Sequence, residues 1–233
     1  MKRYSMGVIG ASALALLAVT SLGAGATQAQ NYASSENRGA DKTVTLSANL
    51  SELNGSGASG TATAVVRNQK ILQMDVQASG LTPDAPHAQH IHFGAQALHE
   101  CPTLAQDSNG DGRLTTAEGV PAYGPVVVSL TTTGDTTPAS FLDVTRFPVA
   151  KNGTIDYSRD NIGFTDVAGT GFAGADGTAK QIADAIRAGE GVVVIHGIDY
   201  DGDGAYSNSR GASELDPTLP AEATDPAVCG ILH

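Results

Sequence analysis

Alternating apolar and polar residues mark the chain from residue 42 onward. Between Lys42 and Leu50 every second side chain is apolar, which predicts a strand with one buried face because successive side chains of a strand point to opposite faces. The segments Thr61–Val66 and Ile71–Ala78 follow, and the polar residues 67–70 between them predict a hairpin. The Gly- and Ser-rich residues 54–60 predict the turn that precedes it.

Four further segments are expected to form strands. They are His87–Phe93, Val126–Thr132, Ser140–Val144 and Val192–His196. The last of these is an unbroken apolar run, which predicts a strand buried on both faces that ends on a histidine. Residues Ala150–Gly177 are rich in Gly, Asp and Asn, and we expect loops there with one or two short strands.

One segment, Ala179–Glu190, predicts a helix, because Ile182 and Ile186 are spaced i, i+4 and glycines follow. The 28 glycines, the absence of Trp and the short strands between turns predict an all-β sandwich or barrel with this one short helix. The chain without its first 29 residues has about 200 residues, which favours one domain over residues 42–233.

The N-terminus has the pattern of a secretory signal peptide over residues 1–29. Lys2 and Arg3 form a basic start, an apolar run extends from Val8 to Val19, and small residues predict cleavage after Ala29. The apolar run is too short for a membrane span, so we expect an exported, soluble protein. Residues 30–41 are polar and without pattern, which predicts a flexible lead.

The charge and the cysteines narrow the function classes. Removal of the signal leaves 11 basic and 24 acidic residues, a formal net charge of −13. Nucleic acids and anionic membranes are therefore not expected as partners, because both require clustered basic residues, whereas cations are. Two cysteines in an exported chain are most simply one disulfide, Cys101–Cys229.

Residues 107–118 match the calcium-binding loop of an EF-hand. Oxygen-bearing side chains occupy positions 1, 3 and 5, glycine position 6 and glutamate position 12, and position 7 contributes its backbone carbonyl. The corresponding residues are Asp107, Asn109, Asp111, Gly112, Arg113 and Glu118. An acidic turn without a metal is the alternative. Pro102, Pro121 and Pro125 leave little room for flanking helices, which favours structural calcium over signalling.

A second acidic loop begins at Asp199. It fits the same pattern at positions 1, 3, 5, 6 and 9, through Asp199, Asp201, Asp203, Gly204 and Ser207. Position 12 is Arg210, a cation that cannot bind calcium. Glu214 or Asp216 is the candidate to complete the coordination, and a plain acidic turn is the alternative of equal weight.

Histidines form the third candidate site. Four of the six histidines, His87, His90, His92 and His99, lie within thirteen residues. His90 and His92 are two residues apart, so both point to one face of the expected strand while Ile91 points to the other. Two imidazoles on one face favour a copper or zinc site over calcium, against the alternative of surface or hydrogen-bonded histidines.

These residues together resemble the copper/zinc superoxide dismutases, over about a third of the mature chain. In that family a His-x-His strand is followed nine residues later by a cysteine, a later strand ends Val-Val-His, and a C-terminal Ala-Cys-Gly pairs with the first cysteine. The matching segments are His90-Ile91-His92, Cys101, Val194-Ile195-His196 and Val228-Cys229-Gly230. The resemblance implies a Greek-key antiparallel β-sandwich, copper bound by His90, His92 and His196, and superoxide dismutation.

The chain departs from that family in two respects. The family's bridging histidine and other zinc ligands should follow Cys101, but that segment holds the acidic loop and no histidine, so zinc is not expected. Pro226 stands where the family has a substrate-guiding arginine, which implies weak dismutation. His87, His99, Tyr123 or water is expected to complete the copper site.

A second resemblance concerns the segment from Ala185 to His196, which looks like the closing part of a chordin-type CHRD domain. CHRD domains are secreted, β-rich modules without an established catalytic role. The sequence thus leaves three functions open: a copper protein with dismutase-like activity, a non-catalytic extracellular module stabilised by calcium, and a copper carrier.

Overall fold

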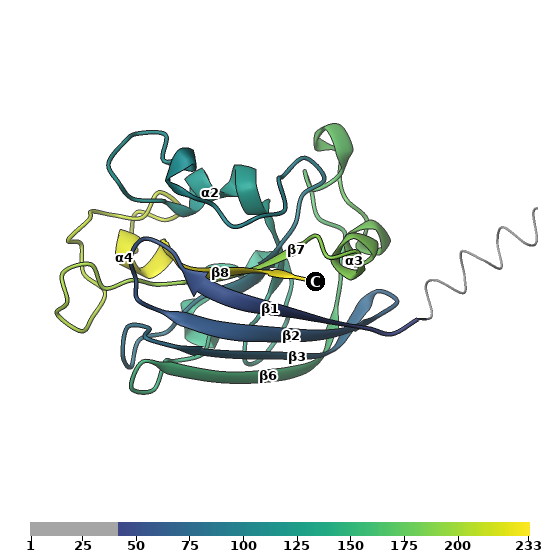
Figure 1. The fold of residues 1–233 in the computed structure, drawn as a ribbon, viewed down its shortest axis with the longest axis horizontal. Helices are drawn as coiled ribbons and strands as arrows, with labels where there is room; N and C mark the ends of the chain where they lie inside the picture. The colour runs from purple at the N-terminus through teal and green to yellow at the C-terminus, as the bar shows by residue number, and fades with distance from the viewer. Residues whose placement is uncertain (1–41) are drawn as a thin grey trace, which may run out of the picture. The chain divides into compact units, whose positions relative to one another are not determined.

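The computed structural model describes residues 42–233, in which eight antiparallel strands form one curled sheet (Figure 1). The strands are β1 (Val44–Glu52), β2 (Ser59–Arg67), β3 (Lys70–Ser79), β4 (Gln89–His92), β5 (Val126–Ser129), β6 (Thr154–Gly163), β7 (Gly191–His196) and β8 (Pro226–Leu232). Their order in the sheet is β5-β4-β7-β8-β1-β2-β3-β6. The expected mainly antiparallel β architecture is confirmed. The predicted signal peptide and lead, residues 1–41, lie outside the described residues.

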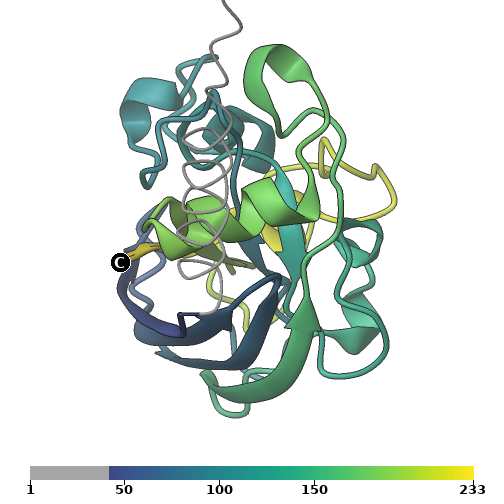
Figure 2. The ribbon, with the colours of Figure 1, turned by 90° about the vertical axis from the view of Figure 1, so that its right-hand side faces the viewer.

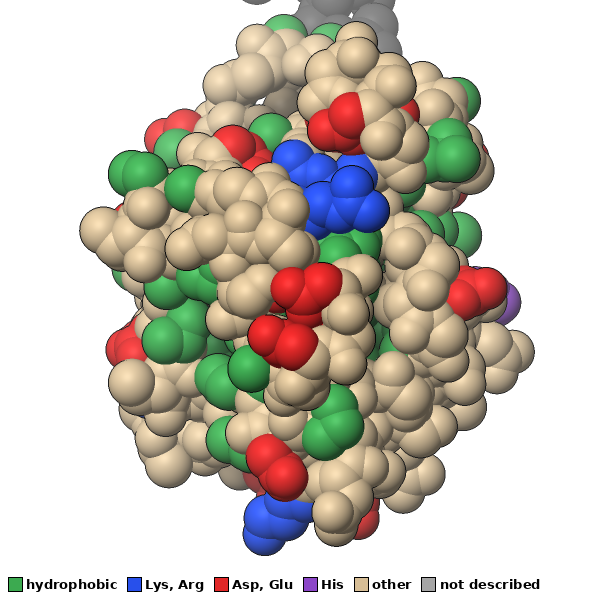
Figure 3. Space-filling view, turned by 90° about the vertical axis from the view of Figure 1, so that its left-hand side faces the viewer, with side chains coloured by type: hydrophobic (Ala, Val, Ile, Leu, Met, Phe, Trp, Pro, Cys, Tyr) green, Lys and Arg blue, Asp and Glu red, His purple; other side chains and the backbone are tan. Residues whose placement is uncertain are grey.

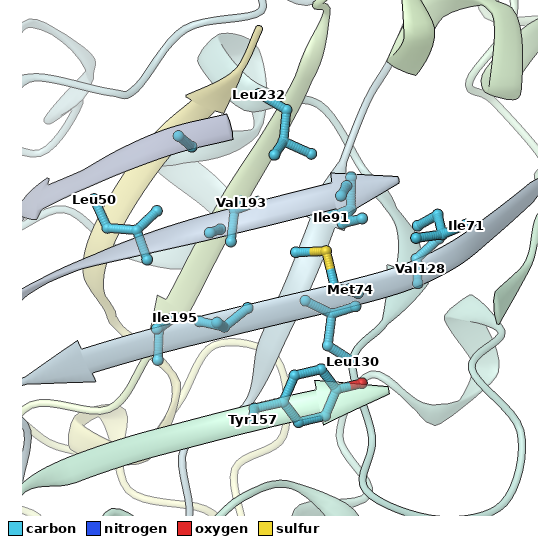
Figure 4. Packing of buried hydrophobic residues seen from close by; sticks show 14 of the residues in the cluster. Leu50, Ile71, Met74, Ile91, Val128, Leu130, Tyr157, Val193, Ile195 and Leu232 are labelled. Atoms are coloured by element: carbon cyan, nitrogen blue, oxygen red, sulfur yellow. The ribbon is translucent and has the colours of Figure 1, made fainter. Parts of the chain in front are cut away.

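The sheet curls around one hydrophobic core. β1 joins its two halves, because β1 pairs with β2 along its length and with β8 through Ser51 and Glu52. Side chains from both halves meet between them (Figure 4), among them Leu50, Met74, Ile91, Val128, Val193 and Leu232. A side-chain hydrogen bond links the two edge strands of the sheet. Tyr157 of β6 donates to the carbonyl of Thr131, just beyond β5, at 3.2 Å.

The strands predicted from alternation are confirmed. In β1 the apolar Leu46, Ala48 and Leu50 are buried and the polar residues between them are exposed. β2 and β3 form the expected hairpin, in which Arg67 pairs with Lys70. The resulting two-residue turn is shorter than the polar segment suggested.

β7 is buried on both faces, as its apolar sequence predicted. Val193 and Ile195 point into the main core, whereas Val192 and Val194 join a second apolar cluster with Tyr123. The outer face of β4 and β7 is therefore also covered by protein. This second buried layer is where the histidines lie.

The described residues contain more helix than the one segment predicted. The α-helices are α2 (Thr116–Tyr123), α3 (Ala179–Arg187) and α4 (Ala221–Thr224), and the 3₁₀ turns are η1 (Leu104–Gln106), η2 (Pro138–Ser140), η3 (Val144–Arg146) and η4 (Phe172–Gly174). α3 is the predicted helix and lies across one end of the curled sheet (Figure 2). None of these helices combines the length and the hydropathy needed to cross a bilayer.

α2 corrects the expectation that prolines leave little room for a helix after the first acidic loop. The side-chain oxygen of Thr115 accepts from the backbone N–H of Glu118, and the Glu118 carboxylate accepts from the backbone N–H of Thr115. This capping box satisfies two N–H groups at the start of the helix and fixes where it begins. Pro121 lies within α2, so proline did not prevent the helix.

Two strand predictions were wrong. Ser140–Val144 is not a strand but connects η2 to η3, because the Asp135 carboxylate accepts hydrogen bonds from Thr137 and Ser140 and holds the chain in a turn. Residues 150–177 contain the ten-residue β6 rather than only short strands, because its apolar alternation covers only Ile155 and Tyr157 before polar residues follow. β8, which contains Cys229, was not predicted as a strand.

Candidate metal centre

The register of β4 and β7 places three histidines on one face of the sheet. His90 lies opposite Val194 in this antiparallel pair, and His196 lies two residues further along β7 on the same face. His92 is two residues from His90, also on that face. The ring centroids are 5.2 Å apart for His90 and His196, 5.7 Å for His90 and His92, and 6.0 Å for His92 and His196.

A backbone carbonyl fixes one ring nitrogen of each histidine. Nε2 of His90 lies 3.1 Å from the oxygen of Phe141, Nδ1 of His92 lies 2.8 Å from that of Gly124, and Nδ1 of His196 lies 2.7 Å from that of Thr224. A carbonyl oxygen can only accept, so each of these nitrogens carries the proton. The lone pair of each neutral ring is therefore on the other nitrogen.

The three lone-pair nitrogens are buried together and have no hydrogen-bond partner in the part of the chain that the structure describes. Nδ1 of His90, Nε2 of His92 and Nε2 of His196 make no hydrogen bond and have almost no contact with solvent. One ligand atom from each ring lies within 4.8 Å of those from the other two. Three lone pairs held this close are the arrangement that a metal ion requires, and the sequence predicted all three residues.

Burial keeps these rings uncharged. Loss of hydration lowers the pKa of His92 to about 3 and the pKa of His196 to about 4. The pKa of His90 is also lowered well below its ordinary value, mainly by burial and further by the neighbouring His196 and His92. Neutral imidazole is the form that binds a metal, so the site is ready for a metal at pH 7.

Two glycines shape the backbone around the site. At Gly124, whose carbonyl accepts from His92, φ is +86° and an added Cβ would lie 2.6 Å from the backbone nitrogen of Gly94. At Gly197, which follows His196, φ is +110° and an added Cβ would lie 2.0 Å from the hydroxyl of Tyr206. Both positions exclude larger residues, which keeps two of the histidines in place.

The other ligands considered from the sequence do not join this group. The ring nitrogens of His87 face other groups: Nδ1 lies 2.8 Å from the carbonyl oxygen of His196 and Nε2 lies 3.0 Å from that of Thr82, and one N–H donates to one of them. Nε2 of His99 donates to the carbonyl of Gly94 at 2.8 Å. Tyr123 packs on the ring of His92, but its hydroxyl donates to the carbonyl of Thr116 at 2.6 Å.

The first acidic loop is largely exposed, and its side-chain oxygens accept hydrogen bonds from its own backbone N–H groups. Oδ1 of Asn109 accepts from the N–H of Asp111 at 2.8 Å, and Oδ1 of Asp111 accepts from the N–H of Arg113 at 2.9 Å. The hydrogen bond from the backbone N–H of Thr115 contributes most to lowering the pKa of Glu118 to about 2. Unlike the histidine nitrogens, these side-chain oxygens already have partners.

The second acidic loop repeats the hydrogen bonds of the first. In both loops the first aspartate accepts from the N–H groups three and five residues later, at 2.7 to 2.8 Å; the bonds run to Asp107 from Gly110 and Gly112, and to Asp199 from Gly202 and Gly204. Asp199, Asp201 and Asp203 also bring one carboxylate oxygen each within 4.8 Å of one another. Both loops lie on the face seen in Figure 3, where acidic side chains are spread around a few basic ones.

Glu222 on α4 takes the place in the second loop that Glu118 has in the first. Each glutamate accepts from the backbone N–H of the second and the ninth residue of its loop. The donors are Ser108 and Thr115 for Glu118, at 2.9 and 3.0 Å, and Tyr200 and Ser207 for Glu222, at 3.1 and 2.5 Å. Glu222 is fully buried. The sequence gave no signal for it, because it lies far beyond the twelfth position.

Glu214 and Asp216, the residues expected to complete the second loop, bond elsewhere. Glu214 accepts from the N–H of Ala117 at 3.1 Å, and Asp216 accepts from the N–H of Thr218 at 2.9 Å. Of the three acidic residues, Glu222 is the one that accepts hydrogen bonds from the backbone of the second loop.

The segment around α4 connects both loops to the histidines. Asp225 is buried and binds Arg113 of the first loop at 2.7 Å and the hydroxyl of Tyr200 of the second at 3.0 Å. The preceding residue, Thr224, supplies the carbonyl that holds His196. Cys101 and Cys229 form the predicted disulfide, which ties the chain before the first loop to β8.

Comparison with known proteins assigns no family to the chain. No protein-family model matches it, and no curated protein matches it either. The candidate site is therefore interpreted from its own residues.

Proposed function

We propose that this protein is an exported copper-binding protein in which His90, His92 and His196 hold the metal. The observation that carries the proposal is the buried, unpartnered nitrogen on each of these rings. Buried polar atoms without partners are rare in folded proteins, because they lose hydration without replacement. One metal ion would supply the missing partner to all three nitrogens. In addition, ligating histidines usually donate their other N–H to a carbonyl or carboxylate, as these three do.

The donor set favours copper. Imidazole nitrogens suit copper and zinc, and copper(II) generally binds a given nitrogen site more tightly. Both cysteines are in the disulfide, so no thiolate competes for the metal. Bound copper would supply one-electron redox chemistry, which is the basis of the dismutase-like activity that the resemblance implies. A second, zinc site is not proposed, because no histidine lies between His99 and His196.

The fold proposed is a Greek-key β-sandwich like that of the superoxide dismutases. The strand order supports it, because β4 lies beside β7 and β3 beside β6, so that three connections, β3 to β4, β5 to β6 and β6 to β7, cross between the halves of the curled sheet. The spacing from His92 to Cys101 and the disulfide to Cys229 agree with the same family.

Export and calcium complete the proposal. A disulfide persists in oxidising compartments, which supports export by the signal peptide predicted over residues 1–29. The EF-hand-like sequence of the first loop supports calcium at Asp107, Asn109, Asp111, Glu118 and the carbonyl of Arg113. The matching hydrogen bonds of the second loop extend this to Asp199, Asp201 and Asp203, with Glu222 at the twelfth place.

The test is metal analysis of protein purified without a polyhistidine tag and exposed to equal amounts of copper and zinc. We expect one copper per chain and little zinc. His92→Ala should lose the copper, since only two imidazoles remain. His99→Ala is the matched control, because His99 lies outside the group and should retain full copper content.

Two outcomes would contradict the proposal. If the wild-type protein takes up no stoichiometric copper, the non-catalytic extracellular module becomes the better interpretation. If His92→Ala keeps its copper, the metal is bound elsewhere. Release of copper to a chelator without any redox activity would identify a carrier.

A further inference from the structure

A narrow cleft leads from the surface to the histidines. Its outer part is formed by partly exposed apolar side chains, chiefly Phe141, Leu142, Val144 and Leu215. Its inner part is formed by buried residues that include His90 and His196. Two of the three rings of the metal centre thus line the cleft, beside Phe141 and Thr224, whose carbonyls hold the protonated nitrogens of these rings.

Among residues 42–233, no charged side chain lines this cleft. Apart from the two histidines, its only polar lining residues are threonines, and the hydroxyl of Thr116 already donates to the carbonyl of Thr224 at 2.6 Å. An ion that leaves water for such surroundings loses hydration and gains no partner. An uncharged molecule loses little, so the lining selects against charge.

The charged residues next to the cleft do not favour anions. Asp143 stands between two lining residues and pairs with Arg146 at 2.7 Å. Glu214 and Asp216 flank Leu215 in the sequence. Arg146 is thus already neutralised, and an anion near the cleft meets carboxylates.

The free space in the cleft is small. Its volume of about 20 Å³ accommodates roughly one molecule of the size of water. Water itself requires two to four polar partners in a buried site, and the lining offers few. The occupant that fits best is therefore small and uncharged, with little need for hydrogen bonds.

We infer that the cleft delivers one small, uncharged molecule, of the size of a diatomic gas, to the metal held by His90 and His196, and that it excludes anions. This inference rests on the proposed function and names the class of reactant for that site. Superoxide, an anion, would be a poor substrate, whereas a neutral molecule of similar size would reach the metal.

The test compares a neutral and an anionic probe on copper-loaded protein whose copper content has been measured. Carbon monoxide is added to the reduced form and followed by its infrared band, and azide is added to the oxidised form and followed by visible absorption. We expect carbon monoxide to bind and azide to bind weakly. Leu142→Lys places a cation beside the cleft and should tighten azide binding by about tenfold or more. Leu104→Lys, on an exposed leucine elsewhere, should not.

A second set of variants fills the cleft with a larger side chain. Ala223→Phe, at a lining position, should abolish the carbon monoxide band while the copper content stays unchanged. Ala105→Phe, at an exposed position, is the control. Because Ala223 precedes the residue that holds His196, Val144→Trp provides an independent variant that fills the cleft from the opposite side.

Metal-free protein separates this inference from the proposed function. Dissolved oxygen is a neutral, paramagnetic diatomic molecule, so it should enhance the relaxation of the methyl resonances of Leu142 and Leu215 more strongly in the wild type than in Val144→Trp. Tight azide binding by the wild type, or no effect of oxygen and carbon monoxide, would overturn the inference. An oxygen effect without any copper binding would instead overturn only the proposed metal.

Discussion

The histidine cluster and the two acidic loops are built in opposite ways. The three histidines are buried, and each has one ring nitrogen bonded to the backbone and one without any partner. The acidic loops are exposed at most positions, and their side-chain oxygens accept hydrogen bonds from nearby backbone N–H groups. Each histidine of the cluster thus keeps one buried nitrogen without a hydrogen bond, whereas the side-chain oxygens of the loops have hydrogen bonds from the backbone of the same loop.

This difference decides how each region supports a metal. A buried nitrogen without a partner costs free energy, about 1–3 kcal/mol for a neutral group, so three of them together call for a ligand. An exposed carboxylate with backbone partners is stable without any ion. A metal at the histidines is thus supported by the structure of the site, while calcium at the loops is proposed from their sequence pattern.

The largest expected effect comes from the covalent link between the two regions. Cys101 precedes the first loop, and Cys229 pairs with Val194 of β7 in the sheet that carries the histidines. Cys101→Ser/Cys229→Ser should lower the free energy of unfolding by about 5 kcal/mol, because the bridge closes a long loop in the unfolded chain. Urea unfolding measures the loss. A change below about 1 kcal/mol would show that the bridge does not hold the regions together.

Acid should weaken the metal-free protein through the histidine cluster. The unfolded pKa of histidine is about 6.5, and the folded pKa is about 3 for His92 and about 4 for His196. The unfolded state therefore takes up more protons below pH 6.5, and stability falls as the pH decreases toward the folded values. From pH 7 to pH 5 the two rings should together remove about 4 kcal/mol.

Asp225 acts in the opposite direction over the same range. Burial raises its pKa to about 6, so the folded state gains a proton that the unfolded state lacks at pH 5. This offsets about 1 kcal/mol of the loss from His92 and His196, which leaves about 2–3 kcal/mol; His90, whose pKa is also lowered, adds to this loss. Urea unfolding at pH 7, 6 and 5 measures it. Equal stability at pH 7 and pH 5 would contradict the buried, neutral cluster.

The cluster could be predicted from the sequence because strand geometry fixes it. Two-residue spacing puts His90 and His92 on one face, and the apolar run before His196 marks a central strand. Neither pattern shows which carbonyls hold the rings. The carbonyls of Phe141 and Thr224 come from segments whose structure the sequence did not reveal, one expected as a strand and one unassigned.

Prediction failed where distant side chains decide the local structure. β6 was missed because its alternation stops after Ile155 and Tyr157: Arg159 takes the next position on the same face, and only pairing with β3 continues the strand. Glu222 was missed because contact with the second loop depends on where α4 packs. The start of α2 was missed although its signal, Thr115 followed by Glu118, is local and could have been used.

Adding calcium tests whether the first acidic loop binds this ion. If the first loop binds calcium, calcium at ten times its Kd should raise the free energy of unfolding by about 1.4 kcal/mol, since only the folded loop binds. Asp107→Ala should abolish this increment from the first loop. Asp160→Asn, an exposed acidic residue of β6, is the matched control and should keep it. An equal increment in both variants would leave the first loop as a plain acidic turn.

The smallest expected effect distinguishes Glu222 from Glu214 as the glutamate that completes the second loop. Glu222→Gln keeps the shape of the side chain but removes its charge and one of its two acceptor oxygens, so calcium should add less stability, by about 1 kcal/mol or below. Glu214→Gln changes a residue that bonds to α2 instead and should leave the calcium increment intact. The readout is the difference in unfolding free energy with and without calcium, which removes any loss that Glu222→Gln causes by itself. If Glu214→Gln lowers that difference and Glu222→Gln does not, the loop closes through Glu214 when calcium binds, and its resemblance to the first loop ends at the ninth residue.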